Sequence, residues 1–488
     1  MTHNLFPNRL PKTIANHLLD TGQGHILDHF SVLDERQKDR FISQLRKIDF
    51  SLLAEMRQRI LGKQNNPHAQ CVTPLAPDNN TFDLATAETP ACLRLRDPTN
   101  HIPPAEAIQQ GDAVVRSGKV GAILVAGGQG SRLGFNGPKG LFKIGPVSQA
   151  SLFEILCGKI IAITNRYGTS LPLAIMTSSA TDEDTKQYFQ ENHFFGLPSN
   201  KVFFFCQKDL PALHEREGTL LLSDMGQLAM APDGHGGLLG SLSETDGLDW
   251  FSKQGVEHIV SFQVDNPLAI PFDSEFLGYH VLTESCFTPQ VIQKVHPSDR
   301  VGVVVESQGI TRVVEYSDLP EDIASMRLPN GRLVFHAGSI AVHAFQRKFL
   351  ERMAQQDNTL PLHMAHKSVP FIDSEGALVS PKKPNAYKFE RFLFDLMPHA
   401  GTVTAVEIDA KQGFAPLKNT AGASSDTAEH VRFAMVSHAR EMLRSAGVQI
   451  AENIDVELAA HSIIDADDIS RFIQSGSTIV TPTVIGSS

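Results

Sequence analysis

The feature that most constrains the fold is an alternation of short apolar segments with helical segments, which begins after Gly111. Segments with a helical pattern separate the first few of these apolar segments from one another. Such alternation is typical of a mostly parallel sheet that helices cover on both faces. We therefore predict an α/β fold with a Rossmann-like central sheet, in which ligands bind at the carboxyl ends of the strands. The clearest predicted strands are 121–126, 171–178, 201–207, 258–265, 301–307 and 311–317.

The regions on either side of this alternation have a different texture. Between Thr13 and Lys63 the apolar residues recur at helical spacing, and the Pro- and Asn-rich segment 65–80 predicts an extended connector. After Gly401 a strand, a loop, a helix and a strand-rich tail indicate a small additional domain. The predicted divisions are a helical N-terminal region with its connector over 1–110, a main α/β domain over 111–400 and a small C-terminal domain over 401–488.

Composition narrows the classes of partner. The 488 residues carry a net charge of −11, which argues against nucleic acid as the main partner, so an anionic ligand must meet local cations. The five cysteines are scattered without a C-x-x-C pair, which favours reduced thiols over a disulfide framework or a zinc site. No apolar run reaches membrane-spanning length, and the N-terminus lacks a signal-peptide pattern. We expect a cytoplasmic protein that binds neither nucleic acid nor membrane.

The stretch "GGQGSRLGFNGPKG", residues 127–140, follows the first predicted strand directly. Its six glycines suit a backbone that bends sharply and lets a ligand approach the amide groups. Its cations, Arg132 and Lys139, favour an anionic ligand. The loop therefore predicts a phosphate site, with a turn that carries solvated charges as the alternative.

Two standard phosphate motifs do not fit this loop. Gly128, Gly130 and Gly134 are spaced one residue too widely for the dinucleotide fingerprint. Pro138 stands before Lys139 where the P-loop requires glycine.

A second glycine-rich loop, "MAPDGHGG" at 230–237, ends where a helix is predicted to begin at Leu238. Backbone amides placed there suit a base edge, a ribose or a sugar hydroxyl. His235 is predicted to contact a ligand or solvent rather than to act in catalysis, because a lone histidine in such a loop seldom does.

Three further segments hold candidates of weaker signal. Asp265 ends an apolar strand, where a carboxylate beside phosphates commonly binds Mg²⁺; the alternative is a helix cap or a turn residue. The segment 381–397 has apolar residues at helical spacing, which predicts a helix with a core-facing stripe and leaves Phe394 off the stripe as a pocket candidate. Lys388 and Lys418 alone look like ordinary surface lysines.

Taken together, several segments resemble the eukaryotic-type UDP-N-acetylhexosamine pyrophosphorylases, within the wider group of UDP-sugar pyrophosphorylases. As a set and in this order they are specific, whereas no single loop is. The matching segments are "GGQGSRLGFNGPKG", "IMTSSATDEDTKQYFQENHFFGLPSNKVFFFCQKDLPAL", "MAPDGHGGLLGSL", "VEHIVSFQVDN", "VGVVVESQGITRVVEYSD", "LVFHAGSIAVHAF", "KPNAYKFERFLFD" and "FAPLKN".

The resemblance implies a nucleotidyltransferase sheet and a Mg²⁺-dependent reaction. UTP and a sugar 1-phosphate give a UDP-sugar and pyrophosphate, when a phosphate oxygen of the sugar attacks the α-phosphorus in line with the departing pyrophosphate. N-acetylglucosamine 1-phosphate is the implied substrate, with glucose 1-phosphate as the alternative. No covalent protein intermediate is expected, so catalysis depends on positioning and charge.

The resemblance also implies roles for individual residues. Arg132, Lys139 and Lys418 would be catalytic, and Asp265 would hold the metal. Nucleotide binding falls to Gly127, Gly128, Gly130, Gln207 and Gly234. Sugar binding falls to His235, Glu315, Ser339, Phe392, Phe394 and Lys388.

The sequence departs from the family pattern at three positions. Ser131 replaces a threonine and keeps the hydroxyl. His235 stands where the acetylhexosamine enzymes have asparagine, and resembles the UDP-glucose branch. Ser339 replaces an asparagine against the sugar. The changes at His235 and Ser339 both fall on the sugar side, so they affect the identity of the sugar substrate more than the nucleotide chemistry.

Two other functions remain as alternatives. A nicotinamide-dependent dehydrogenase is disfavoured by the overlong glycine spacing. A catalytically silent nucleotide-sugar binder would be expected to have lost cations such as Lys139 and Lys418.

Overall fold

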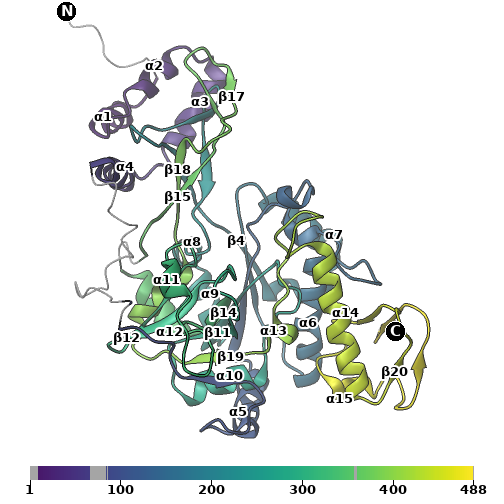
Figure 1. The fold of residues 1–488 in the computed structure, drawn as a ribbon. Helices are drawn as coiled ribbons and strands as arrows, with labels where there is room; N and C mark the ends of the chain where they lie inside the picture. The colour runs from purple at the N-terminus through teal and green to yellow at the C-terminus, as the bar shows by residue number, and fades with distance from the viewer. Residues whose placement is uncertain (1–8, 66–83, 85, 357–359, 487–488) are drawn as a thin grey trace, which may run out of the picture. The chain divides into compact units, whose positions relative to one another are not determined.

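The computed structural model describes residues 9–65, 84, 86–356 and 360–486 (Figure 1). The predicted connector lies outside these ranges except for its first residue, as does Cys71. The chain forms two compact units, each assembled from separate stretches of sequence. Unit 1 comprises 1–74, 208–237 and 360–393, and unit 2 comprises 75–207, 238–359 and 394–488. The three-part division at residues 110 and 400 stays a prediction.

Unit 1 begins with the helices expected from the N-terminal apolar spacing. The start of α3 is fixed by a capping box, because the Asp34 side chain accepts from the Gln37 N–H while the Gln37 side chain accepts from the Asp34 N–H. The four helices are α1 (Lys12–Asp20), α2 (His25–Ser31), α3 (Glu35–Leu45) and α4 (Phe50–Asn65).

Short strands from two later stretches complete unit 1. Strands β15, β18 and β6 form one antiparallel sheet, while β5 pairs with β9, β7 with β8 and β16 with β17. One apolar core joins the helices to these strands and includes Phe30, Phe41, Met56, Leu213 and Phe389. The strands are β5 (Asp209–Pro211), β6 (Leu213–His214), β7 (Leu222–Asp224), β8 (Gln227–Leu228), β9 (Met230–Pro232), β15 (His363–Lys367), β16 (Phe371–Ile372), β17 (Leu378–Val379) and β18 (Ala386–Glu390).

Unit 2 is built on a large sheet with the order β1-β19-β11-β14-β10-β2-β3-β4. All of these strands run parallel except β14, which is antiparallel to both of its neighbours. The sheet therefore confirms the predicted mostly parallel architecture. Its members are β1 (Cys92–Arg94), β2 (Val120–Val125), β3 (Leu173–Thr177), β4 (Val202–Cys206), β10 (His258–Gln263), β11 (Phe287–Gln293), β14 (Ala337–Gln346) and β19 (Ala405–Glu407), with the hairpin β12 (Val303–Ser307) and β13 (Ile310–Val314) attached to β14.

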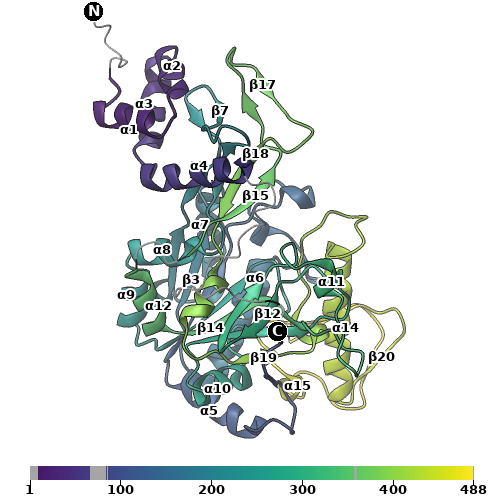
Figure 2. The same ribbon diagram turned by 60° about the vertical axis from the view of Figure 1, so that its left-hand side comes forward.

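Helices cover the sheet of unit 2 and bury its apolar side chains. Helix α6 starts at Ser151, which forms a capping box with Glu154. Helices α5 and α10 lie side by side in both views (Figures 1 and 2). The helices are α5 (Pro104–Arg116), α6 (Leu152–Tyr167), α7 (Asp182–Glu191), α9 (Gly247–Lys253), α10 (Ser274–Leu282), α11 (Glu321–Ala324), α12 (Arg347–Ala354), α13 (Ala410–Gly413), α14 (Ala428–Ser445) and α15 (Ala466–Ile469); α8 (Gly237–Glu244) begins at the last residue of a unit 1 stretch.

The C-terminal residues contribute to unit 2 in two ways. Strand β19 joins the large sheet, and Val431 of α14 belongs to its core. Beyond α14, the pairs formed by β20 (Gln449–Ile450) with β22 (Thr478–Ile479) and by β21 (Val456–Leu458) with β23 (Thr483–Ile485) enclose a small apolar cluster of their own.

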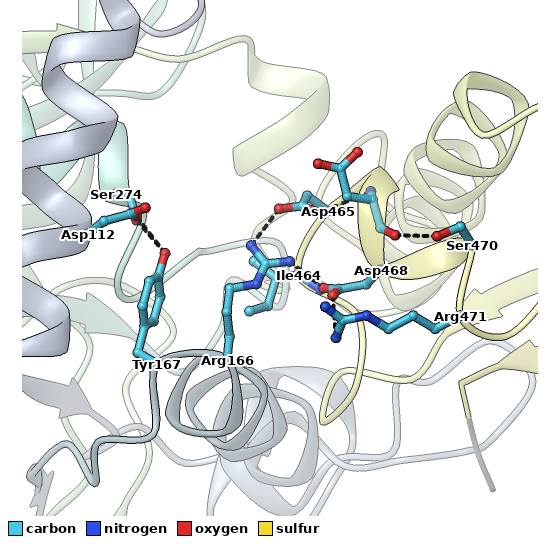
Figure 3. Close-up of polar contacts among 10 residues, drawn as sticks. Asp112, Arg166, Tyr167, Ser274, Ile464, Asp465, Asp468, Ser470 and Arg471 are labelled. Carbon is cyan, nitrogen blue, oxygen red and sulfur yellow. Dashed lines mark hydrogen bonds and ion pairs between the residues drawn. The ribbon is translucent and has the colours of Figure 1, made fainter.

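An ionic contact fixes this C-terminal segment to α6 (Figure 3). The Arg166 guanidinium lies 2.6 Å from an Asp465 oxygen and 2.5 Å from an Asp468 oxygen. The next residue, Tyr167, donates its hydroxyl to Asp112 at 2.6 Å. The Asp468 side chain is 3% exposed and that of Arg166 is 25% exposed, so the Arg166–Asp468 contact is partly shielded from water.

The helix predicted within 381–397, with a core-facing stripe of Phe389, Phe392, Leu393, Leu396 and Met397, is wrong in its first half. Residues Ala386–Glu390 form strand β18, and a 3₁₀ helix follows at Leu393–His399. Phe389 is buried in the core of unit 1, whereas the second half of the apolar pattern belongs to unit 2 from Phe394 onward. The spacing looked helical because a strand and a short helix from two units follow one another.

Among the helices in the described part of the chain, none has the length and apolar character needed to cross a membrane.

Candidate active site

The glycine-rich loop 127–140 leaves β2 at the carboxyl edge of the unit 2 sheet. Two backbone bonds close it: the Lys139 N–H donates to the Gly128 carbonyl at 2.9 Å, and the Gly130 N–H donates to the Gly137 carbonyl at 2.8 Å. The loop is therefore a defined structure that returns Lys139 to the end of its own strand.

Gly127 and Gln207 are in direct contact, as expected for two residues that follow the parallel strands β2 and β4. A Cβ atom on Gly127 would lie 2.3 Å from the Gln207 Nε2, so a larger residue at 127 would displace the Gln207 side chain. Gln207 is 6% exposed, and its Oε1 is buried without a hydrogen-bond partner among the described residues. A buried acceptor without a partner is costly unless a ligand donates to it.

Lys139 and Asp265 form the charged centre of this edge. The Lys139 Nζ lies 3.3 Å from the Asp265 Oδ2 and donates to the Leu417 carbonyl at 3.2 Å. Both side chains are largely buried, at 17% and 12% exposed. Since Asp265 follows β10 and Leu417 precedes Lys418, three distant segments meet at one ammonium group.

The other two predicted catalytic cations are open to solvent. Arg132 lies in a 3₁₀ turn, Ser131–Leu133, and its side chain is exposed. Lys418 is exposed as well, and its backbone N–H donates to the Asp426 carbonyl at 2.9 Å. Both are therefore available to a polyanion.

Ser339 and Glu315, two predicted sugar residues, lie at the same end of the β12–β13 hairpin. The Ser339 N–H donates to the Gly302 carbonyl at 2.8 Å. Val303, which follows Gly302, pairs with Val314, and Glu315 comes directly after Val314. Both side chains are partly exposed.

The second glycine-rich loop belongs to unit 1 and packs against the segment after β18. Gly234 has φ +78°, and a Cβ there would lie 2.6 Å from the Arg391 carbonyl oxygen. The Arg391 guanidinium in turn contacts Asp233 at 2.6 Å. Burial raises the pKa of Asp233 to about 6, although Arg391 opposes the shift. The loop is thus shaped by a partner within its own unit.

His235 is held as a neutral ring. Its Nδ1 accepts the Leu393 N–H at 3.1 Å, and its ring stacks on Phe392 with centroids 5.3 Å apart. Burial lowers the pKa of His235 to about 4, with a smaller contribution from the charge of His363. A neutral imidazole in this setting offers its Nε2–H as a donor and is poorly suited to carry a positive charge.

The two remaining sugar candidates have different settings. Lys388 is partly exposed on β18, opposite Ala365 of β15. Phe394 is 5% exposed and lies in unit 2, whereas Phe392 belongs to unit 1.

Three residues that hold these groups in place were not predicted from the sequence. Asp233 and Arg391 brace the second glycine loop, and Asn266 bonds the loop 413–417. The Asp of "PDGHGG" and the Asn that follows Asp265 were visible, but their partners lie about 150 residues away in the chain.

Comparisons with known proteins agree with this arrangement. Residues 90–461 match the family model described as UTP–glucose-1-phosphate uridylyltransferase. The human UDP-N-acetylhexosamine pyrophosphorylase-like protein 1 is 33% identical, covering 87% of this chain and 84% of the relative. The UDP-N-acetylglucosamine pyrophosphorylase of Saccharomyces cerevisiae is 28% identical, covering 93% and 95%.

A solved structure extends the agreement to the fold. The uridine diphosphate N-acetylglucosamine pyrophosphorylase from Trypanosoma brucei, crystallised with an inhibitor, has a TM-score of 0.75 at 23% identity and covers 94% of each chain. With a family model that matches most of the chain and a relative above 30% identity, the chain belongs to the UTP–glucose-1-phosphate uridylyltransferase family of UDP-sugar pyrophosphorylases, an enzyme family of nucleotidyltransferases.

Proposed function

We propose that the protein makes UDP-N-acetylglucosamine and pyrophosphate from UTP and N-acetylglucosamine 1-phosphate. The observation that carries the proposal is the meeting of Lys139, Asp265 and the Leu417 carbonyl beside a glycine loop that follows a strand. The yeast relative's name supports the choice of sugar.

The chain's own residues account for the nucleotide half of the reaction. The amides of loop 127–140 would bind the triphosphate, and the buried Gln207 Oε1 would accept the N3–H of uracil beside Gly127. The Lys139 ammonium, held within its loop, would stabilise charge that grows on the α- and β-phosphates during attack. Arg132 and Lys418 would add positive charge toward the triphosphate and the sugar phosphate.

The residues at this site can hold Mg²⁺ only if substrate phosphates and waters supply most of its ligands. Within the described ranges no three acidic, histidine or cysteine side chains gather closely enough to hold a metal on their own. Mg²⁺ commonly binds through one carboxylate, substrate phosphates and waters, and Asp265 is a carboxylate at a phosphate loop. When bound there, it would neutralise phosphate charge and orient the two substrates. Asp265 would then exchange its contact with the Lys139 ammonium for the metal.

The sugar half of the site departs from the family pattern at two residues. His235 and Ser339 differ from the pattern of the acetylhexosamine enzymes, and a serine hydroxyl offers fewer hydrogen bonds than an asparagine amide. We therefore propose weaker discrimination than in a typical member, with N-acetylglucosamine 1-phosphate preferred and glucose 1-phosphate measurably used. UTP–glucose-1-phosphate uridylyltransferase activity is the alternative.

The test is release of pyrophosphate from UTP with the 1-phosphates of glucose, galactose, N-acetylglucosamine and N-acetylgalactosamine. The highest kcat/KM is expected for N-acetylglucosamine 1-phosphate. A higher value for glucose 1-phosphate would establish the alternative, and no release with any sugar would reject the enzyme assignment. Full activity in excess EDTA would reject the metal.

Two other outcomes are separable by binding. Calorimetric titration is expected to show binding of UTP and none of NAD, which distinguishes the proposal from a dehydrogenase. UTP binding without turnover would indicate a silent nucleotide-sugar binder. We also propose a cytoplasmic location, with which the thiols of Cys92, Cys157, Cys206 and Cys286 agree, because none of these four is in a disulfide.

A further inference from the structure

Asn266, which follows the proposed metal ligand, is bonded at both ends of its amide to one distant loop. Its Nδ2 donates to the Gly413 carbonyl at 2.8 Å, and its Oδ1 accepts the Ala415 N–H at 3.0 Å. The side chain is buried, at 2% exposed. The Asn266 amide therefore uses one of its N–H donors and its oxygen to bond the backbone of residues 413–415.

The same contact continues one step further along each segment. The Asp265 carbonyl accepts the Leu417 N–H at 2.8 Å, and the Leu417 carbonyl accepts from the Lys139 ammonium at 3.2 Å. The loop 413–417 leads directly into Lys418. Asn266 thus fixes the segment that carries Asp265 to the segment that carries Lys418.

The segment of Asp265 is held from its other end as well. Lys159 of α6 donates to the carbonyls of Pro267 at 2.6 Å and Ala269 at 2.8 Å. Helix α6 starts just after the loop that bears Lys139, and the Leu152 N–H donates to the Phe142 carbonyl at 3.1 Å. Residues 265–269 are therefore bonded both to the loop 413–417 and to α6. The Asn266 amide thus joins that loop to a segment that α6 also holds.

We infer that Asn266 is a positioning residue, which sets the Asp265 carboxylate relative to Lys418 so that metal and sugar phosphate meet in one place. The inference rests on the proposed function. Because its amide is buried and bonds the backbone of residues 413–415, we expect Asn266 to act through the two segments that it joins. Its removal is expected to weaken metal binding in the presence of UTP, since supporting residues of this kind typically contribute 10- to 100-fold.

The test compares Asn266→Ala with a matched control, Asn100→Ala. Asn100 makes a two-ended contact of this kind with a nearby segment of unit 2: its Nδ2 donates to the Arg94 carbonyl at 2.7 Å and to the Tyr279 hydroxyl at 2.8 Å, and its Oδ1 accepts the Arg94 N–H at 3.1 Å. The readouts are Mn²⁺ binding to the UTP-loaded protein by paramagnetic resonance, and the Mg²⁺ concentration for half-maximal pyrophosphate release. Circular dichroism reports folding.

In Asn266→Ala we expect the Mn²⁺ dissociation constant and the half-saturating Mg²⁺ concentration to rise by roughly 10-fold or more. Asn100→Ala should leave both within about twofold. A residue that only stabilises the fold would reduce the active fraction and leave both values unchanged. If the alanine variant does not fold, Asn266→Ser, which keeps a hydroxyl in the site, is measured in its place and the same rise is expected.

Two results would overturn the inference while the proposed function stands: an active wild type whose Asn266 variants keep normal metal affinity, or an equal loss in Asn100→Ala. Absence of pyrophosphate release by the wild type would instead reject the proposed function.

Discussion

The two glycine-rich loops use the same residue type for different purposes. Loop 127–140 follows a buried parallel strand, closes on itself by backbone bonds and carries Arg132 and Lys139. Loop 230–237 begins with the short strand β9 and is shaped by the segment around Arg391, and its charged Asp233 is already paired. The first loop presents positive charge, whereas the second presents a neutral, fixed surface. We therefore expect the first loop to affect mainly kcat and the second loop to affect mainly substrate recognition.

The largest expected effect tests the charge of the first loop. Lys139→Ala should lower kcat by roughly 10²- to 10³-fold, because a fixed charge that acts on the transition state is lost. The measurement is steady-state pyrophosphate release with saturating UTP, on protein shown to be folded by circular dichroism. Near-normal turnover in the folded variant would show that the charge of the first loop does not control the rate.

The next effect tests the backbone of the second loop. Gly234→Ala places a Cβ 2.6 Å from the Arg391 carbonyl at a positive φ. Strain of roughly 1 to 2 kcal/mol should shift the loop, which corresponds to a rise in KM for UTP of about tenfold. We expect kcat to stay within about threefold. A drop in kcat that matches the rise in KM would show that this loop also serves the chemical step.

The third prediction concerns the neutral ring of the second loop. Since the folded pKa of His235 lies below its ordinary value of 6.5, the stability that comes from the neutral ring is present above pH 6.5. It is lost as the pH falls toward 4. At pH 5 the loss should be about 1 kcal/mol, after allowance for the partial exposure of the ring.

Urea denaturation between pH 7 and pH 5 measures this loss, and His235→Asn should reduce it. The pKa values of buried His280 and of partly exposed His438 shift in the same direction, but both residues remain in both proteins, so the difference isolates His235. Equal pH dependence of the two proteins would mean that the ring titrates normally.

The smallest effect tests whether recognition extends beyond the second loop. Ser339→Asn should raise the ratio of kcat/KM for N-acetylglucosamine 1-phosphate over glucose 1-phosphate by about fivefold, the effect of one added hydrogen bond. Ser339→Ala serves as the control and should lower the ratio or leave it unchanged. An unchanged ratio in the asparagine variant would place the choice of sugar elsewhere.

Much of the unit 2 framework was predictable from the sequence. The strands that end at the first glycine loop, Gln207 and Asp265 are apolar and of ordinary length, and the parallel order brings their ends to one edge. These strands and the mostly parallel sheet were predicted, whereas β1, β11 and β14 were not. The antiparallel insertion of β14 was not predictable, because strand direction depends on partners far along the chain.

The contacts that shape the site were less accessible to prediction. The pattern over 381–397 mixes Phe389, which packs in unit 1, with residues that pack in unit 2, and no local periodicity records that change. Likewise Asp233 meets Arg391 and Asn266 meets Gly413 across about 150 residues. The sequence indicated which residue types lay at the site, while the braces between them depend on the tertiary fold.

The divided sequence of unit 1 also has a consequence for synthesis on the ribosome. The helices α1 to α4 emerge first, yet their apolar core is completed by Leu213 and by Phe389, which arrives roughly 330 residues after Met56. At translation rates of about 5 to 20 residues per second, that interval lasts roughly 15 to 65 s. During this time the apolar faces of the N-terminal helices lack their final covering. A nascent chain of this protein should therefore be a substrate for ribosome-associated chaperones, and slower translation of the middle of the message should increase its aggregation.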